Sequence, residues 1–124
     1  MADKKYILVG EDDKFYANIY KIKLAKEGFD VEVVGDGEQV LTSARQKKPD
    51  LILLDLIMPV KDGFETLKEL KADPKLKDIK VVVSSNLGQE EDIKKTVQLG
   101  AVDYLTKANL SIQEVVDKIR GYLK

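Results

Sequence analysis

Five short apolar runs alternate with five stretches of helical periodicity, and this alternation constrains the fold more than any other feature of the chain. The connections are short, and neither an internal repeat nor a low-complexity linker interrupts the pattern. Strand–helix units joined by right-handed crossovers build a parallel sheet with helices on both faces. A chain of 124 residues also suits a single buried core. We therefore predict an α/β protein with a five-stranded parallel sheet and one domain spanning residues 1–124.

The predicted strands cover residues 6–10, 29–33, 51–54, 79–83 and 101–105, and a polar residue follows four of the five directly. The third run is the most informative, because it consists only of Leu and Ile, as is typical of a strand buried on both faces. Asp55 follows it directly, and an isolated carboxylate is costly to bury, so its place at the mouth of this strand requires a reason. The simpler explanation, that strands end in polar residues because loops contact water, stays open from this stretch alone.

The stretches between the strands carry helix start and stop signals. Asp62 is placed to cap a helix, and Ser111 with Glu114 forms a capping box before the last one. Gly28 and Gly100 are placed to end helices. The apolar residues at helical spacing are Phe15, Ile19 and Ile22, then Val40, Leu41 and Ala44, then Phe64, Leu67 and Leu70, then Ile93 and Val97, and finally Ile112, Val115, Val116 and Ile119.

Composition excludes several classes of function. The chain has 21 basic and 22 acidic residues, and from this balance we expect neither nucleic-acid nor membrane binding. The absence of cysteine and histidine excludes disulfides, thiolate or imidazole metal sites and Ser-His-Asp catalysis. No apolar run approaches the roughly 18 residues of a membrane span, and the N-terminal residues lack the apolar core of a signal peptide. We therefore expect a cytoplasmic protein.

Residues suited to phosphoryl transfer follow four of the predicted strands: Glu11, Asp12 and Asp13 follow the first, Asp55 the third, Ser84 the fourth and Lys107 the fifth. The carboxyl ends of parallel strands share one edge, where ligands bind in open α/β sheets. Neighbouring carboxylates repel each other unless a cation is present, and Mg²⁺ suits one or two carboxylates with waters and a phosphoryl group. One carboxylate can then act as nucleophile and form an aspartyl-phosphate, while metal, hydroxyl and ammonium neutralise the phosphoryl oxygens. A phosphohistidine donor would have to come from another molecule.

Each of these residues also has a purely structural interpretation. The acidic run from Glu11 to Asp13 suits a helix N-terminus, and for Asp13 we expect that role in any case. Ser84 could simply be a polar strand end, Lys107 a surface lysine, and Tyr104 a core or interface aromatic residue. The convergence of these residue types at four strand ends favours the functional interpretation.

Four segments together carry a family resemblance: residues 7–13 (ILVGEDD), 50–55 (DLILLD), 58–63 (MPVKDG) and 100–107 (GAVDYLTK). In this order they are highly specific, and over essentially all 124 residues the chain resembles the receiver domains of bacterial two-component response regulators, the CheY type. The resemblance implies a doubly wound, flavodoxin-like (βα)5 three-layer sandwich with the strand order 2-1-3-4-5, a topology taken from the family and not from the residues. It also implies a signalling phosphoacceptor and not an enzyme.

The resemblance implies a role for each candidate residue. Asp55 is expected to accept a phosphoryl group from a phosphohistidine of a sensor histidine kinase or histidine phosphotransfer protein. Asp12 is expected to bind Mg²⁺ (or Mn²⁺) directly, Glu11 to assist through water, and the backbone carbonyl of Ile57 to bind the metal as well. Ser84 and Lys107 are expected to contact the phosphoryl oxygens.

Tyr104 matches the aromatic residue whose rotamer follows that hydroxyl group in the family. Its movement is expected to change the surface of the fourth helix, fifth strand and fifth helix, where a downstream protein partner would bind. We expect a monomer or a weak phosphorylation-dependent dimer, since the mixed charges of residues 90–95 suit a solvated helix face. Because the chain ends with the fifth helix, we expect no output domain.

Three positions depart from the usual family pattern. Ala108 follows Lys107 where receivers usually carry proline, and we predict a trans bond because a cis bond before alanine costs about 2.5–4 kcal/mol. Ser85 stands in place of a small alanine and is expected to narrow access to the phosphoryl group. Ile57 is apolar where some receivers carry a polar side chain that positions the hydrolytic water, so we predict slow self-dephosphorylation.

Other α/β families fit the sequence less well. A flavodoxin-like flavin binder needs a hydroxyl- and amide-rich phosphate loop after the first strand, where this chain has acidic residues. A haloacid-dehalogenase-type phosphatase typically has a second acid two residues after its nucleophile, but position 57 is isoleucine. A dinucleotide-binding domain needs G-x-G-x-x-G after a strand, which is absent. The more serious alternative is a receiver-shaped interaction module that signals without phosphorylation.

Overall fold

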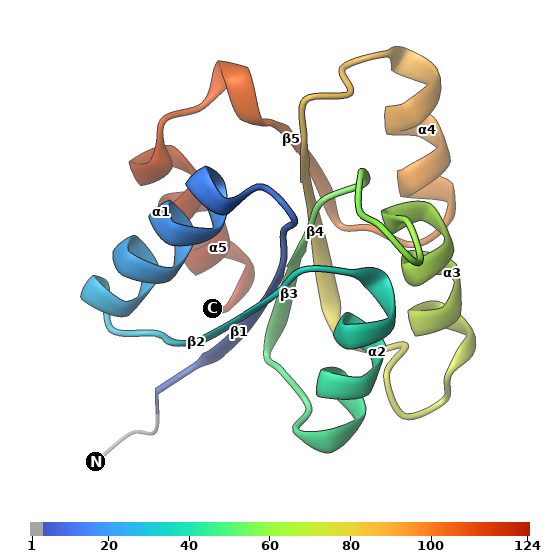
Figure 1. The fold of residues 1–124 in the computed structure, drawn as a ribbon, viewed down its shortest axis with the longest axis horizontal. Helices are drawn as coiled ribbons and strands as arrows, with labels where there is room; N and C mark the ends of the chain where they lie inside the picture. The colour runs from blue at the N-terminus through green and yellow to red at the C-terminus, as the bar shows by residue number, and fades with distance from the viewer. Residues whose placement is uncertain (1–3) are drawn as a thin grey trace.

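The computed structural model describes residues 4–124 and has three layers, a central parallel sheet with helices on both faces (Figure 1). The sheet has the order β2-β1-β3-β4-β5, which confirms the predicted doubly wound α/β fold. The strands are β1 (Tyr6–Gly10), β2 (Asp30–Val34), β3 (Leu51–Leu54), β4 (Lys80–Ser85) and β5 (Asp103–Thr106). The helices are α1 (Lys14–Lys26), α2 (Gly37–Gln46), α3 (Gly63–Ala72), α4 (Glu90–Gln98) and α5 (Ile112–Tyr122), with a short 3₁₀ helix, η1 (Lys107–Asn109), before the last. Residues 1–3 of the predicted domain lie outside the described part of the chain.

Strand β3 lies in the middle of the sheet and is buried on both faces, as its sequence predicts. Leu51 and Leu53 belong to the core beneath α1 and α5, whereas Ile52 and Leu54 belong to the core beneath α2, α3 and α4. Burying one such side chain stabilises the fold by about 1.5–3 kcal/mol relative to leaving it in water. A strand anchored from both sides therefore fixes the residue that follows it, Asp55, at the carboxyl edge of the sheet.

The helix ends follow the predicted signals. Asp62 caps α3 by accepting a backbone N–H at 2.9 Å, and Ser111 forms the predicted capping box of α5. Asp13 caps α1 by accepting a backbone N–H at 2.8 Å, which is the structural role expected for it. Gly28 and Gly100 follow α1 and α4 with positive φ angles of 93° and 107°. Within residues 4–124, no helix combines the length and apolar character that crossing a membrane requires.

Helix α1 forms where the sequence predicts it, but a different face of the helix is buried. Phe15 and Ile22 are 66% and 62% exposed, whereas Tyr20 and Leu24 pack into the core. The apolar spacing points to the wrong face because Tyr20 buries its ring and satisfies its hydroxyl group on the Ser84 side chain, 2.8 Å away.

The ends of strand β4 also differ from the prediction. The strand continues to Ser85, two residues beyond the predicted end at Val83. Ser84 and Ser85 pair with Leu105 and Thr106 of β5, so both serines belong to the sheet. Because successive side chains of a strand point to opposite faces, the two serine hydroxyl groups face different layers of the molecule.

Candidate functional site

A pocket of about 310 Å³ opens at the carboxyl edge of the sheet, where four strand ends converge. It is lined by Asp12, Asp13, Tyr16, Asp55, Ile57, Ser85, Asn86, Leu87 and Lys107. The predicted gathering of acidic, hydroxyl and ammonium groups therefore occurs at this edge, although two of the predicted residues, Glu11 and Ser84, do not line the pocket.

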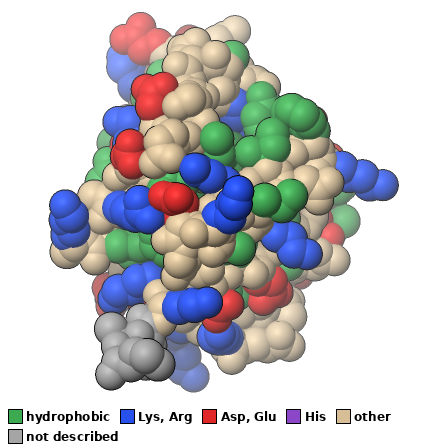
Figure 2. Space-filling view, turned by 90° about the vertical axis from the view of Figure 1, so that its left-hand side faces the viewer, with side chains coloured by type: hydrophobic (Ala, Val, Ile, Leu, Met, Phe, Trp, Pro, Cys, Tyr) green, Lys and Arg blue, Asp and Glu red, His purple; other side chains and the backbone are tan. Residues whose placement is uncertain are grey.

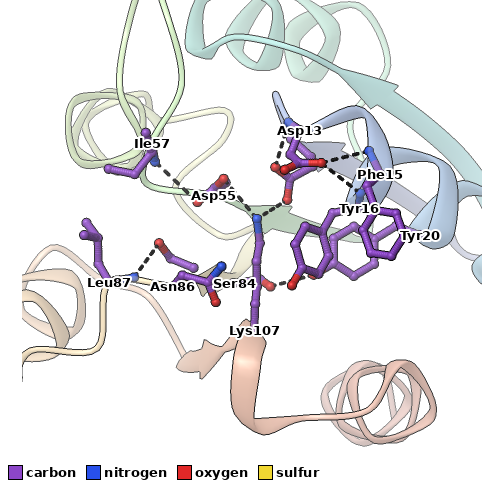
Figure 3. A network of polar contacts seen from close by, with 12 residues as sticks. Asp13, Phe15, Tyr16, Tyr20, Asp55, Ile57, Ser84, Asn86, Leu87 and Lys107 are labelled. Carbon is purple, nitrogen blue, oxygen red and sulfur yellow. Dashed lines mark hydrogen bonds and ion pairs between the residues drawn. The ribbon is translucent and has the colours of Figure 1, made fainter.

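The Asp55 carboxylate lies on the inner wall of the pocket and is only 7% exposed. Its Oδ2 accepts a hydrogen bond from Lys107 Nζ at 3.1 Å, and its Oδ1 accepts one from the Ile57 backbone N–H at 3.3 Å (Figure 3). Behind it, Gly63 packs so closely that a Cβ there would lie 2.3 Å from the Asp55 carbonyl oxygen. The strand, the glycine and the lysine together fix the position of this carboxylate.

Lys107 is buried between acidic groups and an aromatic ring. Its Nζ forms ion pairs with Glu11 and Asp55 and lies 4.5 Å from the centre of the Tyr16 ring. Burial alone would lower the pKa of Lys107, but the bond to Glu11 and the charges of both carboxylates outweigh it and raise that pKa. The ammonium group therefore stays charged beside Asp55.

The two acidic residues predicted to bind metal lie in different surroundings. Asp12 is exposed and lines the pocket. Glu11 is 2% exposed, and its carboxylate contacts Lys107 and accepts the Asp13 backbone N–H at 3.1 Å. Burial raises the pKa of Glu11, and the Lys107 ammonium group opposes that rise. Glu11 therefore does not line the pocket itself but contacts Lys107, which does.

The oxygen ligands of this pocket suit a site in which one or two carboxylates bind Mg²⁺ and waters complete its shell. No group of three or more acidic, histidine or cysteine side chains able to hold a metal occurs within residues 4–124. Asp12 and Asp55 nevertheless line the same pocket, together with Ile57. Mg²⁺ is commonly bound by one or two carboxylates, with waters and substrate phosphates completing its shell. The residues present fit such a site and do not form an all-protein metal cage.

Ser84, the hydroxyl residue expected to contact a phosphoryl group, faces away from the pocket. It is 2% exposed, and its Oγ lies 2.8 Å from the Tyr20 hydroxyl group (Figure 3). The predicted strand end at Val83 is wrong, because β4 continues to Ser85, and with alternating side chains this turns Ser84 to the opposite face from Ser85. Ser85 lines the pocket with Asp55 instead, and its Oγ accepts the Leu87 backbone N–H at 3.3 Å.

The Tyr104 side chain packs against the core beneath α2, α3 and α4. Its hydroxyl oxygen is buried and has no hydrogen-bond partner among the described residues. Burial raises the pKa of Tyr104, and the nearby Ser85 hydroxyl group opposes the rise. A buried hydroxyl group without a partner costs about 1–3 kcal/mol. Because the Tyr104 hydroxyl group makes no hydrogen bond to the described residues, none is lost when the side chain moves.

Asn86 is a pocket residue that the sequence does not reveal on its own. Its Oδ1 accepts the backbone N–H of Ala108 at 3.1 Å and so joins the loop after β4 to η1. The bond between Lys107 and Ala108 is trans, as predicted, because no peptide bond within residues 4–124 is cis. The sequence does contain one signal for this contact. Position 108 is alanine and not proline, so its backbone N–H is present and can donate to the side chain of Asn86.

Comparisons with known proteins agree with this geometry. A family model described as the response regulator receiver domain matches residues 7–120. The DNA-binding dual master transcriptional regulator RpaA of Synechocystis is 36% identical over 118 residues, which cover 95% of this chain and 48% of that protein. The chain thus spans about half the length of the curated relatives it matches.

Two solved receiver domains share the fold. The BeF3-activated receiver domain of RstA from Klebsiella pneumoniae superposes with a TM-score of 0.89 at 26% identity, covering 97% of this chain and 99% of the other. The receiver domain of the sensor histidine kinase PA1611 from Pseudomonas aeruginosa superposes with a TM-score of 0.88 at 26% identity, covering 98% of both chains. That structure has a magnesium ion coordinated in its active-site cleft.

Proposed function

This chain belongs to the response regulator receiver domain family of two-component signalling proteins, and we propose that Asp55 is its phosphoacceptor. The observation that carries the proposal is the position of the Asp55 carboxylate on the wall of an open pocket, 3.1 Å from the Lys107 ammonium group. The donor would be a phosphohistidine of a sensor histidine kinase or a histidine phosphotransfer protein, because this chain has no histidine of its own.

The pocket residues suit the transfer of a phosphoryl group. A carboxylate oxygen of Asp55 attacks the phosphorus atom, the P–N bond of the phosphohistidine breaks, and its electron pair stays on the imidazole nitrogen. Lys107 neutralises charge on the phosphoryl oxygens, since its ammonium group stays protonated beside Asp55. We assign the hydroxyl donor to Ser85 and not to Ser84, because Ser85 alone of the two lines the pocket.

A divalent cation is part of this proposal, as Mg²⁺ or Mn²⁺. Asp12 and Asp55 would bind it with the backbone carbonyl of Ile57. Glu11, which does not line the pocket, would act through its ion pair with Lys107. When bound, the cation neutralises the negative charge that accumulates on the transferred group. Asp12 remains available for this role, since it is exposed and makes no ion pair with the described residues.

We propose that the phosphodonor protein docks on the outer face of α1. This helix carries four lysines and no acidic residue, and its N-cap residue, Asp13, lines the pocket. A groove of about 450 Å³ runs along it, lined by Phe15, Asn18, Ile19, Ile22, Lys23 and Lys26. Figure 2 looks onto the side of the molecule where α1 lies, and there Lys and Arg side chains gather around hydrophobic patches. An apolar centre with a basic rim suits a protein partner with an acidic rim.

We further propose that phosphorylation changes the surface of α4, β5 and α5 for a downstream protein partner. Drawing the Ser85 hydroxyl group toward the phosphoryl oxygens would leave room beside Tyr104, whose hydroxyl group has no bond to give up among the described residues. Helix α4 is lightly anchored, because its N-cap has no side-chain hydrogen bond and Thr96 is its one fully buried residue. Its displacement would therefore disturb little of the core.

The test is phosphorylation by a small donor. We expect acetyl phosphate or phosphoramidate with Mg²⁺ to add the mass of one phosphoryl group, and Asp55→Asn to abolish that gain. Asp78→Asn is the matched control, because Asp78 is exposed and precedes β4 at the opposite edge of the sheet. The gain should also disappear with EDTA, and its persistence would contradict the role assigned to the metal.

The absence of a mass gain in the folded, unmutated protein would contradict the phosphoacceptor proposal. That result would favour the alternative of an interaction module that works without phosphorylation.

A second measurement addresses the lifetime of the phosphorylated state. Ile57 and Leu87 present apolar side chains to the pocket, so we expect slow hydrolysis, which Ile57→Asn should accelerate. Loss of the phosphoryl group within seconds would contradict this expectation.

A further inference from the structure

Asn86 is a polar side chain of the pocket wall that the proposed transfer has not used. It follows Ser85 directly, is exposed, and lines the same pocket as Asp55 and Lys107. Its Oδ1 accepts the Ala108 backbone N–H at 3.1 Å. Since only the oxygen of a side-chain amide can accept a hydrogen bond, this contact decides which way the amide is turned.

The orientation leaves the NH₂ group of Asn86 facing the pocket. In Figure 3 the side chain lies beneath Asp55 and beside Lys107, with its nitrogen atom on the side of the site. Among residues 4–124 this NH₂ group has no hydrogen-bond acceptor, whereas the amide oxygen is already engaged. A fixed and unused donor thus lies close to the carboxylate that would carry a phosphoryl group.

We propose that Asn86 is a phosphoryl-binding residue, whose NH₂ group donates a hydrogen bond to an oxygen of the group carried by Asp55. The Ala108 N–H holds the amide in this orientation. The inference rests on the proposed function of Asp55. It adds a neutral donor to a pocket that already contains the acidic side chains of Asp12 and Asp13. Hydrogen bonds to charged oxygens are stronger than those between neutral groups, so one added donor contributes measurably to affinity.

Asn86 and Ala108 act as a pair in this arrangement. An alanine at position 108 supplies the backbone N–H that a proline lacks. Without this anchor the amide is free to rotate, and an NH₂ group that must first be ordered binds less tightly. The hydrogen bond between Asn86 and Ala108 also connects the loop that follows Ser85 with η1, which begins at Lys107. Ser85 and Lys107 both line the pocket.

Beryllofluoride (BeF3) with Mg²⁺ is the probe, because it occupies the place of the phosphoryl group without a covalent step. Binding is titrated by fluorine NMR. We expect Asn86→Ala to weaken binding about tenfold, the loss of one hydrogen bond to a charged group. Asn86→Asp keeps the oxygen that Ala108 requires but replaces the donor with a negative charge, so we expect it to weaken binding more than Asn86→Ala does.

Ala108→Pro tests the anchor. We expect it to weaken beryllofluoride binding in the otherwise unmutated protein and to have no further effect when Asn86 is already alanine, because the two residues act through one contact. Asn86 is an exposed loop residue, so we expect its variants to fold, and thermal unfolding of each variant is the control for this.

Unchanged affinity in Asn86→Ala, in a titration where Ser85→Ala weakens binding, would overturn the inference. Binding by Asn86→Asp as tight as that of the unmutated protein would also overturn it, since the side chain would then serve only as an anchor. If the unmutated protein itself fails to bind beryllofluoride, the result contradicts the proposed function and this inference with it. These outcomes separate the two proposals.

Discussion

The two faces of the sheet differ in whether a buried tyrosine hydroxyl group is hydrogen-bonded to a serine of β4. On the face covered by α1 and α5, the hydroxyl groups of Ser84 and Tyr20 are paired at 2.8 Å and both residues are buried. On the face covered by α2, α3 and α4, Ser85 and Tyr104 lie near each other, but the buried Tyr104 hydroxyl group has no hydrogen bond to any described residue. One pair is satisfied in this state, and the other is not.

The difference separates a fixed side of the site from a movable one. The α1 face supports Lys107 through the ring of Tyr16, which stacks on Tyr20 with ring centres 6.1 Å apart. On the other face, Tyr104 can move without breaking a hydrogen bond to the described residues, and helix α4 is lightly anchored. A receiver needs both properties, because the acceptor carboxylate must be held still while the surface read by a partner changes.

The largest effect is expected from removing one serine hydroxyl group on each face. Ser85→Ala should weaken beryllofluoride binding about ten- to hundredfold, because the pocket loses a donor to charged oxygens. Ser84→Ala should leave binding within about twofold and instead lower the free energy of unfolding by about 1–2 kcal/mol, since the buried Tyr20 hydroxyl group loses its partner. Fluorine NMR titration and urea unfolding measure the two quantities. The reverse pattern would show that Ser84 is the phosphoryl-binding hydroxyl residue.

Glycine-to-alanine substitutions compare the two helical layers. A Cβ at Gly63 of α3 would lie 2.3 Å from the Asp55 carbonyl oxygen and 2.6 Å from Leu56 Cα, whereas one at Gly121 of α5 meets nothing within 4 Å. We expect Gly63→Ala to lower the free energy of unfolding by about 1–3 kcal/mol and to slow phosphorylation of Asp55. Gly121→Ala should raise the free energy of unfolding by about 0.5 kcal/mol. Equal stability of the two variants in urea would contradict the close packing behind Asp55.

Tyrosine-to-phenylalanine substitutions remove a hydroxyl group from each face. Tyr20→Phe should lower the free energy of unfolding by about 1 kcal/mol, because it leaves the buried Ser84 Oγ unpaired. Tyr104→Phe should instead raise that free energy by about 1 kcal/mol, because it removes a buried hydroxyl group that has no hydrogen-bond partner among the described residues. Urea unfolding of both variants at neutral pH is the measurement. A larger loss in Tyr104→Phe than in Tyr20→Phe would reverse the comparison.

The smallest effect concerns the C-terminal end of α5. The Tyr122 hydroxyl group donates to Asp103 Oδ2 at 2.6 Å, and this bond, with burial and the aspartate charge, raises the pKa of Tyr122 to about 12. The folded protein thus holds this proton more tightly than the unfolded chain, whose tyrosines titrate near pH 10. The resulting stabilisation is fully present below about pH 10 and is lost as pH rises toward the folded-state pKa.

Tyr122→Phe should therefore flatten the loss of stability between about pH 10 and pH 12, measured by urea unfolding across that range. Asp103→Asn is the companion variant, because it keeps an acceptor for the hydroxyl group but removes the charge. A stability–pH profile of Tyr122→Phe that matches the unmutated protein would contradict the contribution of this bond.

Most of the fold can be read from the sequence because its signals are local. The Leu- and Ile-rich run before Asp55 predicts a strand buried on both faces, and Asp62 and Ser111 predict helix starts that the structure confirms. The buried face of α1 cannot be read in the same way. Tyr20 becomes a core residue only because a hydroxyl group from β4, far away in the sequence, satisfies its own.

By itself the sequence determined the order of the elements, the acidic edge of the sheet and the position of Asp55 directly after a strand that is buried on both faces. These features depend on composition, periodicity and capping, which are properties of neighbouring residues. Only the tertiary structure decided that Ser85 and not Ser84 lines the pocket, that Glu11 contacts Lys107, and that Asn86 is oriented by Ala108. Strand register and contacts between loops fix these choices, and a shift of one residue along β4 is enough to reverse which hydroxyl group faces the site.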